Sequence, residues 1–273
     1  MSKKRTTAVA RQAQQERRKA IRNVLIVVAV LVAVGGLYVR SALGSRPLDS
    51  VTLCPTNPDS ITVLLVDVTD PMTLAQKQDF RNQLDRLTAQ IPRHGKLVIT
   101  KVDPVSEKLL SPIVTRCNPG VGADTSNLDG NPAKLDRLHK EKFIAPIQDA
   151  YDQILVASGA DRSPILESIQ SINLTELASD PRSDIRKKLV VASDLLQHTD
   201  SLSFYQTLPA AEQLIDSQSF SRVRTDLRGV EVELWMLQRG DSTRSQPRAL
   251  PDLWEKMIRA QGGELMRVYT VSG

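Results

Sequence analysis

A run of apolar and β-branched residues at positions 61–66 (ITVLLV) constrains the fold of this chain more than any other feature. Six such residues in a row predict a strand buried on both faces, as in a parallel sheet covered by helices. The run ends abruptly in Asp67, Thr69 and Asp70, before a proline and a predicted helix start. Open α/β sheets place their ligand sites at the carboxyl ends of their strands, so this acidic tip is the first candidate site.

The rest of the chain predicts more strands with helical patterns between them. Apolar spacing at Phe80, Leu84, Leu87 and Ile91 is typical of one buried helix face. Strands that alternate with helices indicate βαβ units, so we expect an α/β fold: a doubly wound, mostly parallel central sheet flanked by helices. The further predicted strands are 97–102, 113–117, 189–192, 230–237 and 266–271, and residues 118–142, rich in Gly, Asn, Asp and Pro, predict a long loop.

An uncharged apolar segment lies near the amino terminus, at residues 23–39. Its length is at the short end for a membrane-spanning helix. Basic residues crowd the side before it, so the positive-inside rule places residues 1–22 in the cytoplasm and the chain after the segment outside. We expect a single-pass anchor in the inner (plasma) membrane, of bacterial type, followed by a stalk at 40–57 and a periplasmic or otherwise extracytoplasmic domain at 58–273. A cleavable signal peptide is the alternative, because residues 42–44 (ALG) loosely fit a small-residue cleavage site.

The net charge of +5 comes from the amino-terminal segment. Residues 1–50 hold ten of the 36 Lys and Arg residues but two of the 31 acidic ones, which leaves 26 basic and 29 acidic residues in the remainder. A mildly acidic globular part argues against a nucleic-acid partner there.

Three places in the chain, in the right order, resemble the von Willebrand factor A-like family. Residues 67–71 (DVTDP) resemble the family's Asp-x-Ser-x-Ser turn after the first strand. Ser163-Pro164 and the predicted helix after it are similar to the loop that supplies a threonine ligand in the family. Ser193-Asp194 matches the aspartate that follows the fourth strand. The resemblance spans residues 58–273 and implies a metal-ion-dependent adhesion site.

The resemblance implies Mg²⁺ as the cofactor and a carboxylate of a partner protein as the ligand that completes its coordination. The ion prefers six oxygens and keeps several waters, so a few carboxylates and hydroxyls from separate loops suffice. Pro71 departs from the pattern, because it stands where the family has a second hydroxyl. The alternative is a degenerate, metal-free site whose two aspartates stabilise helix amino termini. The expected metal ligands are Asp67, Thr69, Ser163 and Asp194.

The two cysteines, Cys54 and Cys117, are expected to form a disulfide in an oxidising compartment. The resemblance implies that segments 97–102 and 113–117 form an antiparallel hairpin. That hairpin would bring Cys117 to the edge where the first strand begins, close to Cys54. Two free thiols are the alternative. The same arrangement moves residues 118–142 away from Asp67, so we assign Asp124 and Asp129 to turns rather than to the metal site.

No catalytic set is visible in the sequence. His94, His139 and His198 lie far apart without metal-ligand spacing, and there is no phosphate-binding glycine loop or nucleophile elbow. We therefore expect a membrane-anchored protein-interaction module that is not an enzyme. A metal-dependent hydrolase on the same sheet and a structural subunit of an envelope assembly are the alternatives.

Overall fold

The computed structural model describes residues 3–44, 46–104, 109–126, 130–156, 159–178, 180, 182, 184–239 and 246–271. The chain divides into two compact units, Met1–Pro47 and Leu48–Gly273. The first unit consists of one long helix, α1 (Lys3–Gly44). Within it, the 21 residues Glu16–Gly36 are long and apolar enough to cross a membrane, and their side chains are exposed. They overlap the predicted span at 23–39, whose role as an anchor stays a prediction.

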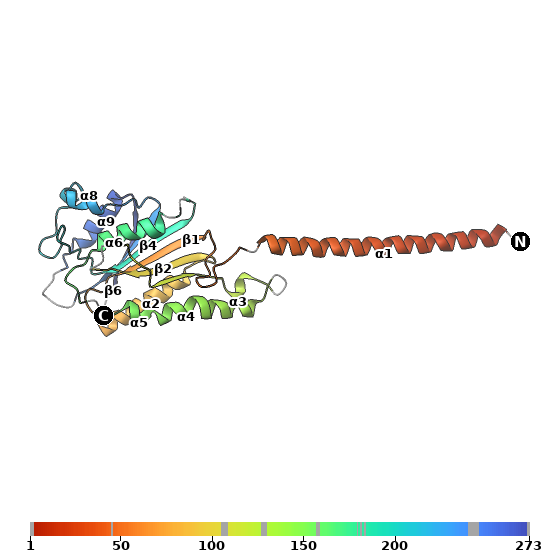
Figure 1. Cartoon of the computed structure of the whole chain (residues 1–273), viewed down its shortest axis with the longest axis horizontal. Coiled ribbons are helices and arrows are strands. Elements are labelled where there is room, and N and C mark those ends of the chain that lie inside the picture. Colours follow the sequence, from red (N-terminus) through yellow and green to blue (C-terminus); the bar gives the residue numbers. More distant parts are fainter. Residues whose placement is uncertain are drawn as a thin grey trace. The chain divides into compact units, whose positions relative to one another are not determined.

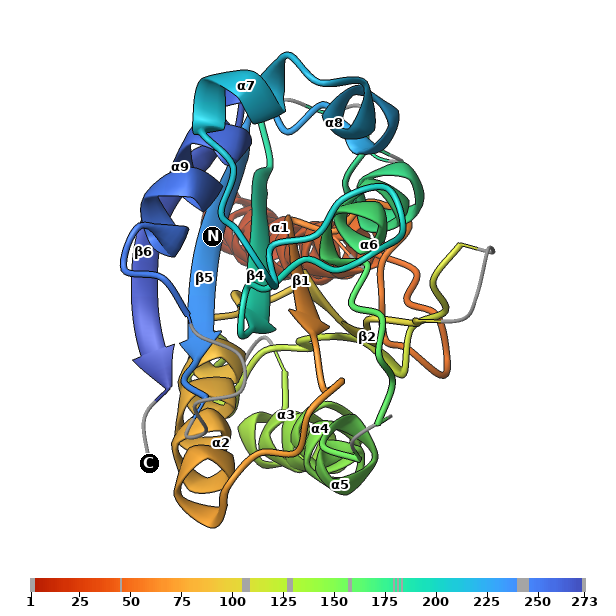
Figure 2. The same cartoon turned by 90° about the vertical axis from the view of Figure 1, so that its left-hand side faces the viewer.

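The second unit is built on a six-stranded sheet in the order β3-β2-β1-β4-β5-β6 (Figures 1 and 2). β3 runs antiparallel to β2, as the resemblance implied, and the other neighbouring pairs are parallel. All six strands predicted from the sequence are present, so the expected doubly wound, mostly parallel sheet is confirmed. The strands are β1 (Ser60–Val66), β2 (Gly95–Lys101), β3 (Val114–Cys117), β4 (Arg186–Ser193), β5 (Val230–Leu237) and β6 (Glu264–Val271).

Helices cover both faces of the sheet. In Figure 2, α6, α7, α8 and α9 lie on one side of the strands, and α2, α3, α4 and α5 lie on the other. The described α-helices of this unit are α2 (Leu74–Ala89), α3 (Pro132–Leu138), α4 (Ala145–Asp149), α5 (Tyr151–Ile154), α6 (Ile165–Ile172), α7 (Ala211–Ile215), α8 (Gln218–Val223) and α9 (Leu250–Ala260). A short 3₁₀ helix, η1 (Gly122–Asp124), and two π-helical segments, η2 (His139–Ile144) and η3 (Asn173–Leu177), complete the unit's described helical elements.

β1 contributes side chains to both hydrophobic cores, one on each face of the sheet. All seven of its residues are buried, because the sheet is covered on both sides. Successive side chains of a strand point to opposite faces. Accordingly, Val63 and Leu65 belong to the core under α6 and α9, while Leu64 and Val66 belong to the core under α2. The apolar run at residues 61–66 therefore separates the two cores and contributes side chains to each.

Local capping residues set where the helices next to the sheet begin and end. Thr73 caps α2: its hydroxyl accepts from the Gln76 amide at 3.2 Å, and the Gln76 side chain accepts from the Thr73 amide at 3.0 Å. Gly262 ends α9 in the left-handed region, at φ +83°. The expected loop at 118–142 is wrong in its second half, since Asn131 caps α3 and Pro132 occupies its first turn.

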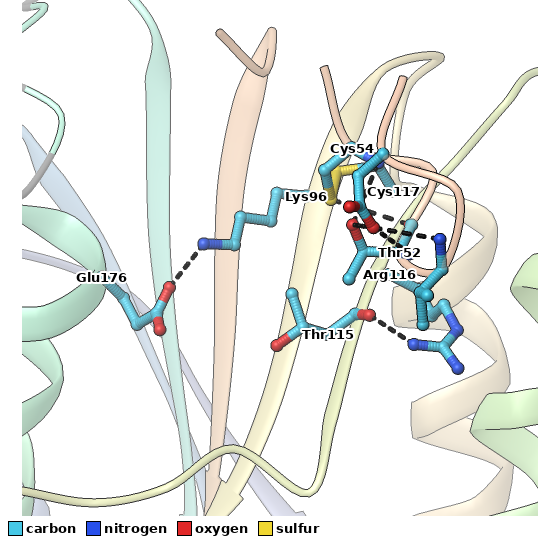
Figure 3. Close-up of a disulfide and its surroundings, with 9 residues drawn as sticks. Thr52, Cys54, Lys96, Thr115, Arg116, Cys117 and Glu176 are labelled. Carbon is cyan, nitrogen blue, oxygen red and sulfur yellow. Dashed lines mark hydrogen bonds and ion pairs between the residues drawn. A yellow bond between two sulfur atoms is a disulfide. The ribbon is translucent and has the colours of Figure 1, made fainter. Parts of the chain in front are cut away.

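Cys54 and Cys117 form the predicted disulfide, with their Cα atoms 4.8 Å apart. Figure 3 shows the bridge joining the segment before β1 to the end of β3. A backbone hydrogen bond of 2.8 Å from the Cys117 amide to the Thr52 carbonyl supports the same junction. This end of the sheet lies opposite Asp67. Asp124 accepts from the Val121 amide in a turn there, as expected, and Asp129 lies outside the described residues.

Candidate functional site

The carboxyl ends of three neighbouring strands meet in one crevice. Val66, the last residue of β1, pairs with Ala192 of β4, and Ala192 pairs with Trp235 of β5. The residues that follow these positions therefore lie side by side. Asp67 continues the ladder through a 2.8 Å hydrogen bond from its amide to the Ala192 carbonyl. The register thus brings the loops after β1, β4 and β5 to one point.

Asp67 is the buried centre of this crevice, with 3% of its surface exposed. Its Oδ2 accepts hydrogen bonds from the hydroxyls of Ser163 at 2.8 Å and Ser193 at 2.9 Å. Its Oδ1 accepts from the Thr69 amide at 3.1 Å. Three donors hold the carboxylate in place, two from loops and one from the end of β4. The predicted meeting of Asp67, Thr69 and Ser163 is therefore present in the structure, and Ser193 joins them.

Ser163 reaches the crevice because its backbone is tied to the loop after β4. The amides of Ser163 and His198 each donate to the other's carbonyl at 2.9 Å, which forms an isolated antiparallel bridge. Its hydroxyl points to Asp67 rather than to the start of α6, which has no side-chain cap. The His198 ring does not take part in these contacts: its Nδ1 lies 2.8 Å from the Ser203 hydroxyl, and it stacks on Tyr205.

Asp194 lies in a tight turn at the end of β4. The next residue, Leu195, is in the left-handed region at φ 64°, which is uncommon for a side chain of this type. The Leu195 amide donates to the Ser193 hydroxyl at 2.8 Å, and the Trp254 indole donates to the Leu195 carbonyl at 2.9 Å. Asp194 Oδ1 accepts from the Leu196 amide at 2.9 Å. These contacts stabilise the strained turn that places the carboxylate beside Asp67.

Arg239 is the site residue that the sequence reasoning missed. Its guanidinium forms ion pairs with both Asp194 and Asp70, and 11% of its side chain is exposed. Its amide donates to Gln246 Oε1 at 2.9 Å, and Gln246 in turn donates to the Asp194 and Leu237 carbonyls, each at 2.9 Å. Arg239 follows the end of β5 by two residues. The strand-end rule that selected Asp67 would have selected it as well.

The electrostatics of Asp194 reflect competing neighbours. Burial, and after it the negative charge of Asp67, raises the pKa of Asp194 to about 6. The guanidinium of Arg239 and the hydrogen bond from the Leu196 amide act in the opposite direction and lower this pKa. Arg239 thus supplies the positive charge that favours the ionised form. Without that cation, two buried carboxylates would face each other across the crevice.

The crevice opens into a pocket with a volume of about 210 Å³. Asp67 and Asp194 line it as nearly buried side chains, and Asp70 is more exposed, with 42% of its side chain accessible. Ser163 is not part of the wall, because its hydroxyl is buried behind Asp67. The residues that line the pocket are Asp67, Thr69, Asp70, Pro71, Met72, Thr73, Gln76, Asp194, Leu237, Gln238 and Arg239.

The residues present do not fit the Mg²⁺ ion that the family resemblance implies. The charge of Asp194 is met by Arg239, and Asp67 is satisfied by hydroxyl and amide donors. Pro71 offers no oxygen from its side chain. Within the part of the chain that the structure describes, no group of three or more His, Cys, Asp or Glu side chains is arranged to hold a metal. The ligand roles of Asp67, Thr69, Ser163 and Asp194 remain a prediction.

The strand order and the crevice are those of a doubly wound α/β domain, and this arrangement is similar to von Willebrand factor A domains of known structure. Similar solved structures include the von Willebrand factor A domain of SpRpn10 (11% identity, 77% of this chain and 87% of that chain, TM-score 0.39). They also include the conserved hypothetical protein BatB from Bacteroides thetaiotaomicron (12% identity, 77% of this chain and 91% of that chain, TM-score 0.36). A third similar structure is that of an aerotolerance-related membrane protein from Bacteroides fragilis NCTC 9343 (10% identity, 78% of this chain and 92% of that chain, TM-score 0.34).

No family model matches the chain, and no curated protein matches it. At these identities and TM-scores the similarity concerns the arrangement of strands and helices, and no function follows from it.

Proposed function

We propose that the globular domain is a protein-interaction module without enzymatic activity, and that the strand-end crevice is its binding face. The observation that carries this proposal is the pocket of about 210 Å³ into which the loops after β1, β4 and β5 converge. Its charged groups are held by hydrogen bonds and ion pairs from separate loops, as a preorganised binding site requires. Asp70 and Arg239 are the pair that a partner would meet at its wall.

An exposed apolar side chain beside the pocket supports a protein partner. Leu74 is 86% exposed, although it belongs to the first turn of α2. It lies in sequence between Thr73 and Gln76, which both line the pocket. A large exposed apolar side chain that adjoins pocket-lining residues in the sequence suits an anchor for a protein partner, since apolar contacts supply affinity and polar ones specificity.

We propose that this face works outside the cytoplasm, on a domain attached to the inner membrane by α1. The apolar stretch Glu16–Gly36 supports the anchor, and the Cys54–Cys117 disulfide supports an oxidising compartment. The basic residues before the stretch would then be cytoplasmic. A cleaved signal peptide is the competing assignment, and amino-terminal sequencing of the protein from its native membrane separates the two: an intact basic tail supports the anchor.

A finer form of the proposal has a partner carboxylate bridged to Asp67, Thr69, Ser163 and Asp194 through Mg²⁺. The ion pair of Arg239 with Asp194 argues against this form, because the guanidinium already supplies a positive charge at that carboxylate. Dependence of partner binding on a divalent ion is the property that distinguishes the two forms.

Crosslinking and co-purification from native membranes test the binding face. The wild-type chain should capture a partner protein, and Leu74→Ser should lower its recovery several-fold. Val51→Ser is the matched control: Val51 is 64% exposed but precedes the disulfide, at the opposite end of the sheet, so capture should be unchanged. Equal capture by both variants would exclude the crevice as the binding face. Each capture is repeated with EDTA to test the metal-bridged form.

A further inference from the structure

We infer that Arg239 is the resident counter-ion of the strand-end carboxylates, and that the site therefore works without a divalent metal ion. The inference concerns the face used in the proposed function, but it makes a claim about ion binding that can be tested without any partner. Either claim can therefore fail alone.

The first ground is the position of the guanidinium. It forms ion pairs with Asp194 from the β4 loop and with Asp70 from the β1 loop, in a side chain that is 11% exposed. Gln246 fixes the backbone of Arg239 and also donates to the Asp194 carbonyl. An arginine presents a planar fork of donors that suits carboxylate oxygens. The guanidinium is therefore held in the crevice by carboxylates from two different loops.

The second ground is that the other buried carboxylate needs no cation. Asp67 receives the Ser163 and Ser193 hydroxyls on one oxygen and the Thr69 amide on the other. A buried carboxylate with three donors is well satisfied by neutral groups. A metal ion would have to compete with these donors at Asp67 and with Arg239 at Asp194.

The third ground is the number of oxygens left for a metal. Mg²⁺ demands near-octahedral oxygen coordination and gives up its water reluctantly. Pro71 removes one side-chain oxygen from the turn after β1, and Arg239 binds the carboxylate of Asp194. A divalent ion placed between these residues would also lie close to a guanidinium, and like charges repel strongly where water is excluded.

The carboxylate of Asp194 therefore needs one positive charge beside it, and the side chain of Arg239 provides that charge permanently. Removal of that side chain should let a divalent ion take its place beside Asp194, with water filling the coordination positions for which the crevice has no side-chain oxygen. Asp194 would then keep the nearby negative charge of Asp67 without a cation beside it, and Asp70 would lose its ion pair as well.

Mn²⁺ binding measured by electron paramagnetic resonance tests the inference on the full chain in a non-ionic detergent. The wild-type protein should show no saturable Mn²⁺ binding at millimolar concentrations. Arg239→Ala and the bulkier Arg239→Gln should each gain a single saturable Mn²⁺ site, and Mn²⁺ should raise the thermal midpoint of both variants. Arg239→Lys, which keeps the positive charge, should gain none.

Arg228→Ala is the matched control. Arg228 also pairs with an aspartate, Asp226, but it lies at the amino end of β5 and its side chain is 81% exposed. Its removal should create no Mn²⁺ site. Saturable Mn²⁺ binding by the wild-type protein that Asp67→Asn abolishes would overturn the inference. So would a folded Arg239→Ala or Arg239→Gln variant that binds no Mn²⁺, whereas binding by either variant but not by the wild type supports it.

Discussion

The Cys54–Cys117 disulfide should contribute about 4 kcal/mol to the free energy of unfolding, by the chain-entropy estimate for the loop it closes. The bridge joins residues separated by 63 positions, so the unfolded chain loses considerable freedom. We expect the variant Cys54→Ala/Cys117→Ala to unfold at a urea concentration lower by about 2 M, if the urea dependence is about 2 kcal/mol per M. The loss should be global, because the bridge ties the segment before β1 to the edge strand β3.

Urea unfolding followed by tryptophan fluorescence measures the effect, since Trp235 and Trp254 are both buried. The oxidised wild type, the reduced wild type and the double variant form the complete set. The difference in urea midpoint between the oxidised and the reduced wild type isolates the effect of loop closure. The difference between the reduced wild type and the double variant isolates the lost side-chain volume at Cys117, which is fully buried. Equal midpoints for oxidised and reduced wild type would refute the reasoning, because the entropic effect requires only that the covalent bond be present.

Three further predictions concern the core, one ion pair and the anchor. Phe80→Ala should lower the free energy of unfolding in urea by about 3–5 kcal/mol. The ring is fully buried, and its centroid lies 5.9 Å from that of the Trp235 ring, so its removal leaves a cavity. A smaller loss of stability would mean that the neighbouring side chains collapse into that cavity. The side-chain hydrogen bond from Arg182 is the main cause that lowers the pKa of Asp180 to about 2. Since the folded-state pKa is depressed, the pair stabilises the fold above pH 4 and loses this effect as the pH falls towards 2. Asp180→Asn should therefore cost about 1 kcal/mol at pH 7, after allowance for solvent screening, and almost nothing at pH 2; a cost independent of pH would contradict the assignment. Leu31→Arg in the apolar stretch should cost about 3 kcal/mol of insertion and shift the protein from the membrane to the soluble fraction, and unchanged fractionation would argue against a membrane-spanning α1.

The strands could be predicted from the sequence, but the contacts at the strand ends could not. The spacing of apolar residues was enough to predict all six strands: β1 is an unbroken apolar run because both of its faces are buried, whereas β5 alternates because one of its faces is less buried. The helical patterns between the strands predicted the parallel sheet. The six predicted segments differ from the observed strands at their ends by at most three residues, as for the start of β4 at Arg186 rather than at residue 189. The second half of the 118–142 segment was misjudged, because its turn-forming composition hid a short helix capped by Asn131.

The sequence by itself determined which chain segments form the sheet and that acidic and hydroxyl side chains follow its central strands. It did so because strand burial is encoded locally, in the period of apolar residues. Only the tertiary structure decided the hydrogen bonds and ion pairs of those side chains: Ser163 turns away from its helix towards Asp67, and Arg239 reaches Asp194 from the loop after β5. Such contacts join residues 96 and 45 positions apart, and they depend on strand order and register, which no local pattern specifies.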